Sequence, residues 1–188
     1  MPRPHGGKLI DRTIKPAQRK KILEQVSTLP RLDLGPDMVQ DLENIGNGVF
    51  SPLDGFMSCD DFHNVLDNMR LASDVPWTIP IVLSLDAKLI KAKGLEPGGS
   101  VALFHGLAGK TVGMLHIEDI YGFNKKELSK KVYGTEDPDH PGVRKVNRMG
   151  DKLVGGKIEL ISEAPNPFPK YHLKPRETRV LFKEKNWR

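Results

Sequence analysis

The sequence has 188 residues, a mass of 21.0 kDa and a formal net charge of +5, with 38% hydrophobic and 28% charged residues. These values predict a soluble globular chain of one domain, or one domain with a small appendage, and exclude a disordered one. No apolar run approaches the ~18 residues of a membrane span, and the first residues lack the apolar segment of a secretory signal. The single cysteine, Cys59, excludes an internal disulfide and a multi-cysteine zinc site, so we expect a cytoplasmic location.

Charge is distributed unevenly along the chain. Residues 1–31 carry 8 basic and 2 acidic residues, residues 32–141 carry 9 and 17, and residues 142–188 carry 12 and 5. Basic ends around an acidic middle could form a surface that attracts anions, although solvated or internally neutralised ends are the simpler interpretation. Aromatic residues are not interleaved with a dense basic stripe, so the sequence does not favour nucleic-acid binding.

Three helices are predicted in the first part of the chain, over residues 16–29, 36–45 and 60–70. In each segment apolar residues recur at helical spacing. Pro36 suits the first turn of the second helix and Gly46 its C-terminal end, while Ser58 suits the N-cap of the third. We expect the apolar stripes to pack in the core.

The pattern changes to alternation from Trp77 to Leu85, which predicts a half-buried strand, with Pro80 favouring an edge or the start of a strand. Further strands are predicted at 101–104, 111–117 and 157–161, a turn at 95–99, and helices at 125–132 and 175–185. Leu181 and Phe182 are expected on the buried side of the last helix. Helices followed by a strand-rich part predict an α+β fold with a small barrel-like sheet.

Two short patterns suggest chemistry but have simpler explanations. Gly109-Lys110-Thr111 resembles the end of a phosphate-binding loop, but it lies between two predicted strands and Phe104 stands where that loop needs glycine. A hairpin turn explains it better. Among the six histidines no two are three or four residues apart, although His105 and His116 could approach across the hairpin. A structural role is the commoner one for each.

The segment from Ser51 to Met57 is dense in turn residues and is followed by apolar anchors. Asp54 and Gly55 are residue types that tolerate positive φ. A nucleophilic role for Ser51 needs a base and an oxyanion site, and the sequence indicates neither. We therefore interpret the segment as a rigid structural turn.

Residues 134–143 form the most distinctive stretch, because three carboxylates, among them Asp137 and Asp139, stand beside His140. Acid–base chemistry or metal binding by these side chains is conceivable, and Arg144 follows closely. Pro138 and Pro141 instead favour a stiff, exposed loop whose carboxylates are solvated. These four residues, Asp137, Asp139, His140 and Arg144, are the candidate site residues of the sequence.

Taken together, several segments resemble the N-terminal domain of the ATP sulfurylase (sulfate adenylyltransferase) family. The matching segments are His5-Gly6-Gly7-Lys8-Leu9, Asn47-Gly48-Val49-Phe50-Ser51-Pro52-Leu53-Asp54-Gly55-Phe56-Met57, Asn68-Met69-Arg70-Leu71-Ala72, Trp77-Thr78-Ile79-Pro80-Ile81, Val132-Tyr133-Gly134-Thr135 through His140-Pro141-Gly142-Val143, and Pro175–Arg188. Their order and spacing extend over the whole chain, which makes the combined resemblance far more specific than any one motif.

The resemblance implies a PUA-like fold over residues 1–174, a small mixed β-barrel with flanking helices, and a linker helix over 175–188 that leads toward a catalytic domain. The family makes adenosine 5′-phosphosulfate and pyrophosphate from ATP and sulfate, with magnesium. Its catalytic domain carries a Gln-Thr-Arg-Asn-Pro run followed by a His-x-x-His pair, and a later Gly-Arg-Asp segment. This chain contains none of them.

We therefore expect this chain alone to be inactive, with no catalytic, substrate-binding or metal-binding residue of its own. Its expected role is to support a catalytic domain in the same or a separate chain, in a possible homo-oligomer, away from membranes. If such a domain docks here, an apolar patch should be exposed near Leu181, Phe182 and Trp187.

Two alternatives stay open at this point. PUA domains elsewhere bind RNA, and a stand-alone RNA-binding module would show salt-sensitive affinity. A stand-alone enzyme that uses the 134–142 loop would hold a ligand or a metal ion at Asp137, Asp139 or His140.

Overall fold

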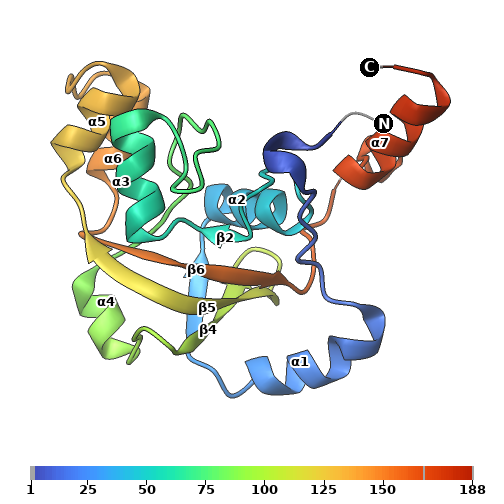
Figure 1. Ribbon diagram of the computed structural model, residues 1–188. Helices are drawn as coiled ribbons and strands as arrows, with labels where there is room; N and C mark the ends of the chain where they lie inside the picture. Colours follow the sequence, from blue (N-terminus) through green and yellow to red (C-terminus); the bar gives the residue numbers. More distant parts are fainter. Residues whose placement is uncertain (1–2, 167, 188) are drawn as a thin grey trace. The chain divides into compact units, whose positions relative to one another are not determined.

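The computed structural model describes residues 3–166 and 168–187 (Figure 1). Residues 1, 2, 167 and 188, which belong to the predicted 1–174 domain and 175–188 linker, lie outside the described residues. The helices are α1 (Arg19–Val26), α2 (Pro36–Gly46), α3 (Cys59–Asn68), α4 (Ala87–Ala92), α5 (Lys125–Tyr133), α6 (Pro141–Asn147) and α7 (Pro175–Glu184). The strands are β1 (Arg31–Leu34), β2 (Gly55–Phe56), β3 (Leu83–Leu85), β4 (Ser100–His105), β5 (Lys110–Gly122) and β6 (Lys152–Leu160).

The strands hydrogen-bond in the order β1-β4-β5-β6-β2, and β3 also pairs with β6. β1 is parallel to β4, whereas β4 and β5 form an antiparallel hairpin and β3 is antiparallel to β6. Within the described residues this sheet is open, with β1 and β2 at its two ends. Mixed α and β content is thus confirmed, but the expected barrel is not, because the sheet does not close.

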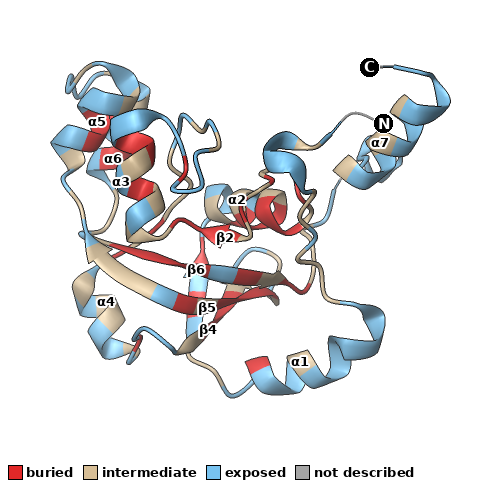
Figure 2. Ribbon diagram, viewed as in Figure 1, coloured by how far each residue is buried: buried red, intermediate tan, exposed pale blue. Residues whose placement is uncertain are grey.

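The chain divides into two compact units, and the first comprises Met1–Gly55, Ser100–His116 and Lys157–Arg188. One core cluster of this unit joins α1 to the hairpin through Val26, Ala102, Met114 and Ile161. The buried residues of α2 include Val39, Leu42 and Ile45 (Figure 2). Two glycines permit close packing: a Cβ at Gly113 would lie 3.0 Å from Leu42 Cδ2, and one at Gly46 would lie 2.6 Å from Leu160 Cβ.

The second unit comprises Phe56–Gly99 and Ile117–Gly156. Its core cluster consists of Phe62, Leu66, Leu128, Val146 and Leu153, which come from α3, α5, α6 and β6. α3 begins as predicted, since the Ser58 side chain accepts a hydrogen bond from the Asp61 amide (3.3 Å). Asp119 accepts a hydrogen bond from the Cys59 amide, and with Asp60 it adds to desolvation in raising the pKa of the Cys59 thiol.

Most predicted elements are confirmed with shifted ends. The helices expected at 36–45, 60–70 and 125–132 are α2, α3 and α5, and the helix expected at 16–29 is a short 3-10 turn followed by α1. The Gly109-Lys110-Thr111 segment belongs to the hairpin, as predicted: Gly109, at φ 61°, is the last residue of the connection between β4 and β5, and Lys110 and Thr111 begin β5. The turn from Ser51 is also structural: the buried Ser51 hydroxyl donates to the Gly48 carbonyl and accepts from the Ile10 amide.

Several predictions about individual residues are wrong. A positive φ is expected at Asp54 or Gly55, but Gly55 begins β2. The residue of this region with a positive φ is Gly48, at 88°. The hairpin register pairs His105 with Lys110 and Ser100 with His116, so the two histidines lie at opposite ends of the hairpin rather than near each other.

The strand predicted from Trp77 to Leu85 is mostly a loop, because only Leu83–Leu85 pairs with β6. Pro80 has no amide hydrogen to donate to a ladder, and Ile79 is exposed. In the loop before β3, the alternating pattern therefore corresponds to exposed and half-buried loop residues and not to one face of a sheet.

Four of the strands and α-helices in the described residues were not predicted. One is β2, a strand of two residues in the segment interpreted as a turn. β1 has only four residues, and α4 has only six. α6 begins at Pro141, which was interpreted as part of a stiff loop although proline is common at the first helical position.

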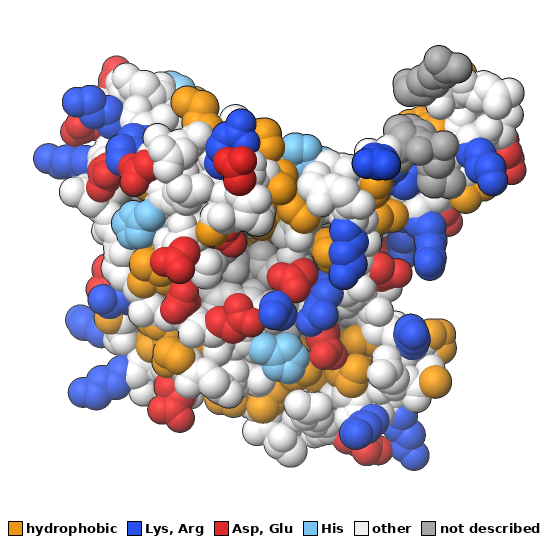
Figure 3. All heavy atoms as spheres, viewed as in Figure 1, with side chains coloured by type: hydrophobic (Ala, Val, Ile, Leu, Met, Phe, Trp, Pro, Cys, Tyr) orange, Lys and Arg blue, Asp and Glu red, His pale blue; other side chains and the backbone are white. Residues whose placement is uncertain are grey.

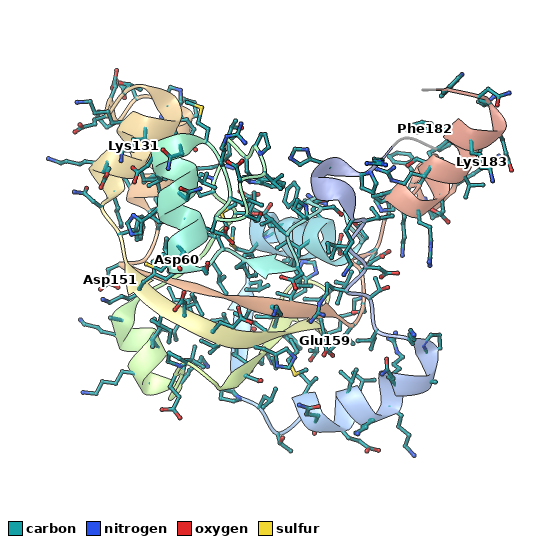
Figure 4. All side chains as sticks on the ribbon, in the orientation of Figure 1. Asp60, Lys131, Asp151, Glu159, Phe182 and Lys183 are labelled. Atoms are coloured by element: carbon teal, nitrogen blue, oxygen red, sulfur yellow. The ribbon has the colours of Figure 1, made fainter. Side chains whose placement is uncertain are left out.

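Asp151, labelled in Figure 4, accepts a hydrogen bond from the Ala87 amide at the start of α4 (2.7 Å). This hydrogen bond lowers the pKa of Asp151 from its usual value of 3.8. The stabilisation is therefore complete above that value and is lost as the pH falls through the folded-state pKa. We expect Asp151→Ala to lower the thermal midpoint at pH 7, with a difference from wild type that shrinks below about pH 4.

Asp151→Asn is the matched control, because it keeps the acceptor oxygen and removes the titrating group. Thermal unfolding followed by circular dichroism between pH 2 and 7 measures both variants. A wild-type advantage over Asp151→Ala that persists unchanged at the lowest pH would contradict this account of the cap.

Candidate functional site

The loop that carries the sequence candidates connects α5 to α6 in the second unit. Gly134 ends α5 at φ 71°. The Thr135 hydroxyl accepts from the Asp137 amide, and an Asp137 carboxylate oxygen accepts from the Asp139 amide (3.0 and 2.9 Å). The Asp137 carbonyl accepts from the His140 amide (3.1 Å). The loop is thus organised by consecutive polar turns.

His140 is the N-cap of α6, where its Nδ1 accepts a hydrogen bond from the Gly142 amide (3.2 Å). Its ring lies 5.1 Å from the ring of Tyr133. Asp137, Asp139 and Arg144 are exposed, and Arg144 lies on α6. The structure therefore brings Asp137, Asp139 and His140 together along one loop, where the hydrogen bonds described connect them to backbone amides. A catalytic or binding role for these residues stays a prediction.

A second polar arrangement, which the sequence analysis missed, lies in the first unit on three consecutive strands. His116 on β5 is 3.0 Å from the Ser100 hydroxyl through Nδ1 and 3.3 Å from the Glu159 carboxylate through Nε2. Figure 4 labels Glu159 on β6. His116 and Glu159 are partly exposed, so an ion pair between them is worth little. The arrangement links three strands, and the hairpin register was the signal that could have revealed it.

Two hollows of about 360 and 340 Å³ border the segment from Leu173 to Arg179 and the N-terminal segment that includes Leu9. Opposite charges meet beside them: Lys174 pairs with Glu163 at 2.5 Å, and Arg176 lies 3.9 Å from Asp11. Because the positive charges of Lys174 and Arg176 face carboxylates, the first hollow does not form an evident anion site.

α7 is attached to its unit largely through such surface contacts, because none of its residues is buried. Val180 and Leu181 are exposed, and Trp187, which is 58% exposed, lies beside Phe182 with ring centroids 5.8 Å apart and ring planes inclined at 40°. The expectation that Leu181 and Phe182 lie on the buried side of the helix is therefore wrong for Leu181, which is 37% exposed, whereas Phe182 is half-buried. The expected exposed apolar patch near these residues is confirmed.

Cationic side chains surround the patch. Arg176, Arg179 and Lys183 lie on α7, and Lys185 follows it with its amine 5.6 Å from the Trp187 ring. Figure 4 labels Phe182 and Lys183, and Figure 3 shows Lys and Arg side chains gathered around α7. A ten-residue helix is marginal in water without tertiary packing, so α7 is well suited to contact a further body of protein.

The residues that the structure describes show no evident magnesium site. Across residues 3–166 and 168–187, no group of three or more His, Cys, Asp and Glu side chains could hold a metal ion. Nor does any helix in the described part of the chain have the length and apolarity to cross a membrane.

The family description "PUA-like domain" matches residues 2–163, and the chain belongs to this family. The resemblance to sulfate adenylyltransferases is also confirmed. The chain is 49% identical to a sulfate adenylyltransferase from Pyrococcus abyssi and 48% identical to one from Thermococcus onnurineus, each over 186 residues. In both comparisons the match covers 99% of this chain and 47% of the relative, so the chain spans about half the length of these relatives.

The fold is similar to part of a solved structure. A hexameric APS kinase from Thiobacillus denitrificans matches with a TM-score of 0.74 and 25% sequence identity. The match covers 99% of this chain and 32% of the other. A PUA-like fold with mixed α and β content and an open sheet is consistent with both comparisons.

Proposed function

We propose that this chain is the N-terminal, non-catalytic domain of a sulfate adenylyltransferase, the enzyme that forms adenosine 5′-phosphosulfate and pyrophosphate from ATP and sulfate. The observation that carries the proposal is the match of nearly the whole chain to about half of each curated relative. In this proposal residues 1–174 form the supporting domain, and residues 175–188 lead to a catalytic domain in the same or a separate chain.

The absence of the family's catalytic motifs from the sequence supports this division of labour. Sulfate is a poor nucleophile, and the α-phosphoryl group accumulates charge in the transition state. Catalysis therefore needs positioned Arg and His donors and a metal-bridged nucleotide. ATP and magnesium belong to the complete enzyme, and we assign their binding to the catalytic domain.

The exposed face of α7 supports the second part of the proposal. Val180, Leu181 and Trp187 present apolar surface beside several cations. Apolar side chains grouped in this way are typical of a surface that packs against another domain. We further propose that the complete enzyme is cytoplasmic and assembles as a homo-oligomer; the hexameric structural neighbour supports the second point.

A chimera tests the proposal directly. This chain replaces the matched 186-residue stretch of the Pyrococcus abyssi sulfate adenylyltransferase, and pyrophosphate release from ATP and sulfate is measured. We expect the chimera to be active, because the replaced stretch provides support rather than catalytic groups. The matched control is the Pyrococcus abyssi enzyme with the stretch deleted, which we expect to be inactive or unstable. A folded, monodisperse chimera without activity would contradict the proposal.

A further inference from the structure

The loop that follows α3 in the second unit is held by hydrogen bonds to side chains of that helix. The Asn64 side-chain amide donates to the Arg70 and Leu71 carbonyls, both at 2.9 Å. The Ala72 amide donates to an Asp61 carboxylate oxygen (2.8 Å). These bonds connect the loop to α3 through two side chains of the helix, so its conformation is set by the unit itself.

Trp77 closes the same loop from its other end. Its backbone amide donates to the Met69 carbonyl (2.8 Å), and its indole Nε1 donates to the Ile79 carbonyl (2.7 Å). One residue thus fixes the backbone at both Met69 and Ile79. The side chains of Met69 and Ile79 therefore project from a loop whose backbone conformation is already fixed.

Two residues of the loop adopt a backbone conformation that is costly for their type. Met69, which follows the last residue of α3, has φ 54°, and Asp74 has φ 65°. Aspartate tolerates this region because its short polar side chain bonds locally, but glycine is the usual residue at the position Met69 occupies. A long apolar side chain there opposes local folding preferences.

Met69 and Ile79 also gain little from burial within the unit. Their exposed fractions are 61% and 55%. Figure 3 shows hydrophobic side chains at the surface beside this loop. A residue that is both strained and exposed contributes little to folding, and such departures from local rules are expected at functional positions. What the Met69 side chain can supply is an adaptable apolar contact.

We propose that Met69 and Ile79, which we call the Met69 patch, dock into an apolar depression on the other half of a sulfate adenylyltransferase polypeptide. This inference rests on the proposed function and adds a contact in the second unit to the one expected at α7. The occupant is chosen because the matched stretch is only 47% of the Pyrococcus abyssi relative, whose remaining polypeptide is a large body of protein available for contact.

Methionine oxidation tests the proposal on the intact chain. Hydrogen peroxide converts exposed methionine to its sulfoxide, and peptide mass spectrometry follows each site. Met57 and Met114 are buried and serve as internal references. We expect Met69 to oxidise readily in the free chain and distinctly more slowly in the active chimera described above, because a docked side chain is shielded from the oxidant.

Three substitutions distinguish docking from folding. Met69→Gly relieves the strained φ and removes the patch side chain, so it should leave the melting temperature of the free chain unchanged or higher and lower that of the chimera. Asp74→Gly, the matched control, relieves the second strained φ and leaves the patch intact, so it should shift both proteins equally. Ile79→Ser should behave as Met69→Gly does in the chimera without changing the free chain.

Each outcome bears on one claim. An active chimera in which Met69 oxidises as fast as in the free chain overturns the docking proposal and leaves the proposed function standing. A folded but inactive chimera counts against the proposed function first. If Met69 of the free chain is protected as its concentration rises, and a dimer forms that Met69→Gly abolishes, the occupant is a second copy and the proposal is overturned.

Discussion

Replacing Gly48 with alanine is expected to cost about 3 kcal/mol or more of folding free energy, from backbone strain and steric overlap combined. Gly48 has φ 88°, which L-residues rarely adopt, and an added Cβ would lie 2.2 Å from the Ile10 carbonyl oxygen. That oxygen belongs to the backbone, so it cannot move aside as the end of a side chain would. Chemical denaturation, with the midpoint and slope fitted together, measures the loss.

Gly109→Ala is the matched control for this effect. Gly109 has φ 61°, and a Cβ built there has no neighbouring atom within 4 Å. Only the strain contribution is present, so we expect a loss of about 1 kcal/mol. If Gly48→Ala were no more destabilising than Gly109→Ala, the close approach of the N-terminal segment to Gly48 would be wrong.

Replacing Phe62 with alanine is the second change with a large expected effect, about 3–5 kcal/mol. Phe62 is 1% exposed in the core cluster of the second unit, with its ring centroid 5.7 Å from that of Tyr121 and 6.1 Å from that of Phe123. Alanine leaves a cavity between these rings and removes their edge contacts. A melting temperature lowered by roughly 10 °C is the expected result for a chain of this size.

Leu107→Ala is the control for loss of an apolar side chain without loss of core. Leu107 is 85% exposed in the β4–β5 connection, so we expect a change within about 0.5 kcal/mol. Equal destabilisation by the two substitutions would show that Phe62 is not buried as described.

Local signals allowed much of the fold to be predicted. Pro36 begins α2 and Ser58 caps α3, because these residues act through their own neighbouring backbone, whereas the C-cap of α2 is Asn47 rather than the expected Gly46. The same reasoning failed from Trp77 to Ile81, where the alternating pattern belongs to a loop held by a tryptophan indole and by prolines. Periodicity cannot distinguish these cases, since the deciding hydrogen bonds come from tertiary structure.

The candidate sites show the same limit. The position of His116 between Ser100 and Glu159 depends on the register of three strands, which no single segment specifies. The predicted helix over residues 60–70 includes Met69, but the positive φ and the exposure of Met69 follow from where α3 stops. By contrast, the exposed patch at the C-terminal helix could be predicted. The sequence resembles one domain of a family and lacks the motifs of that family's catalytic domain, so a docking surface was expected.

We infer that the groups that activate sulfate and the nucleotide lie outside these 188 residues. The most direct measurement incubates the purified chain with ATP, sulfate and magnesium and follows the release of pyrophosphate. We expect a rate equal to that of a blank without protein. Turnover at about 1 per second or faster, in the range of ordinary enzymes, would contradict the account if it were lost on substitution of a residue in this chain.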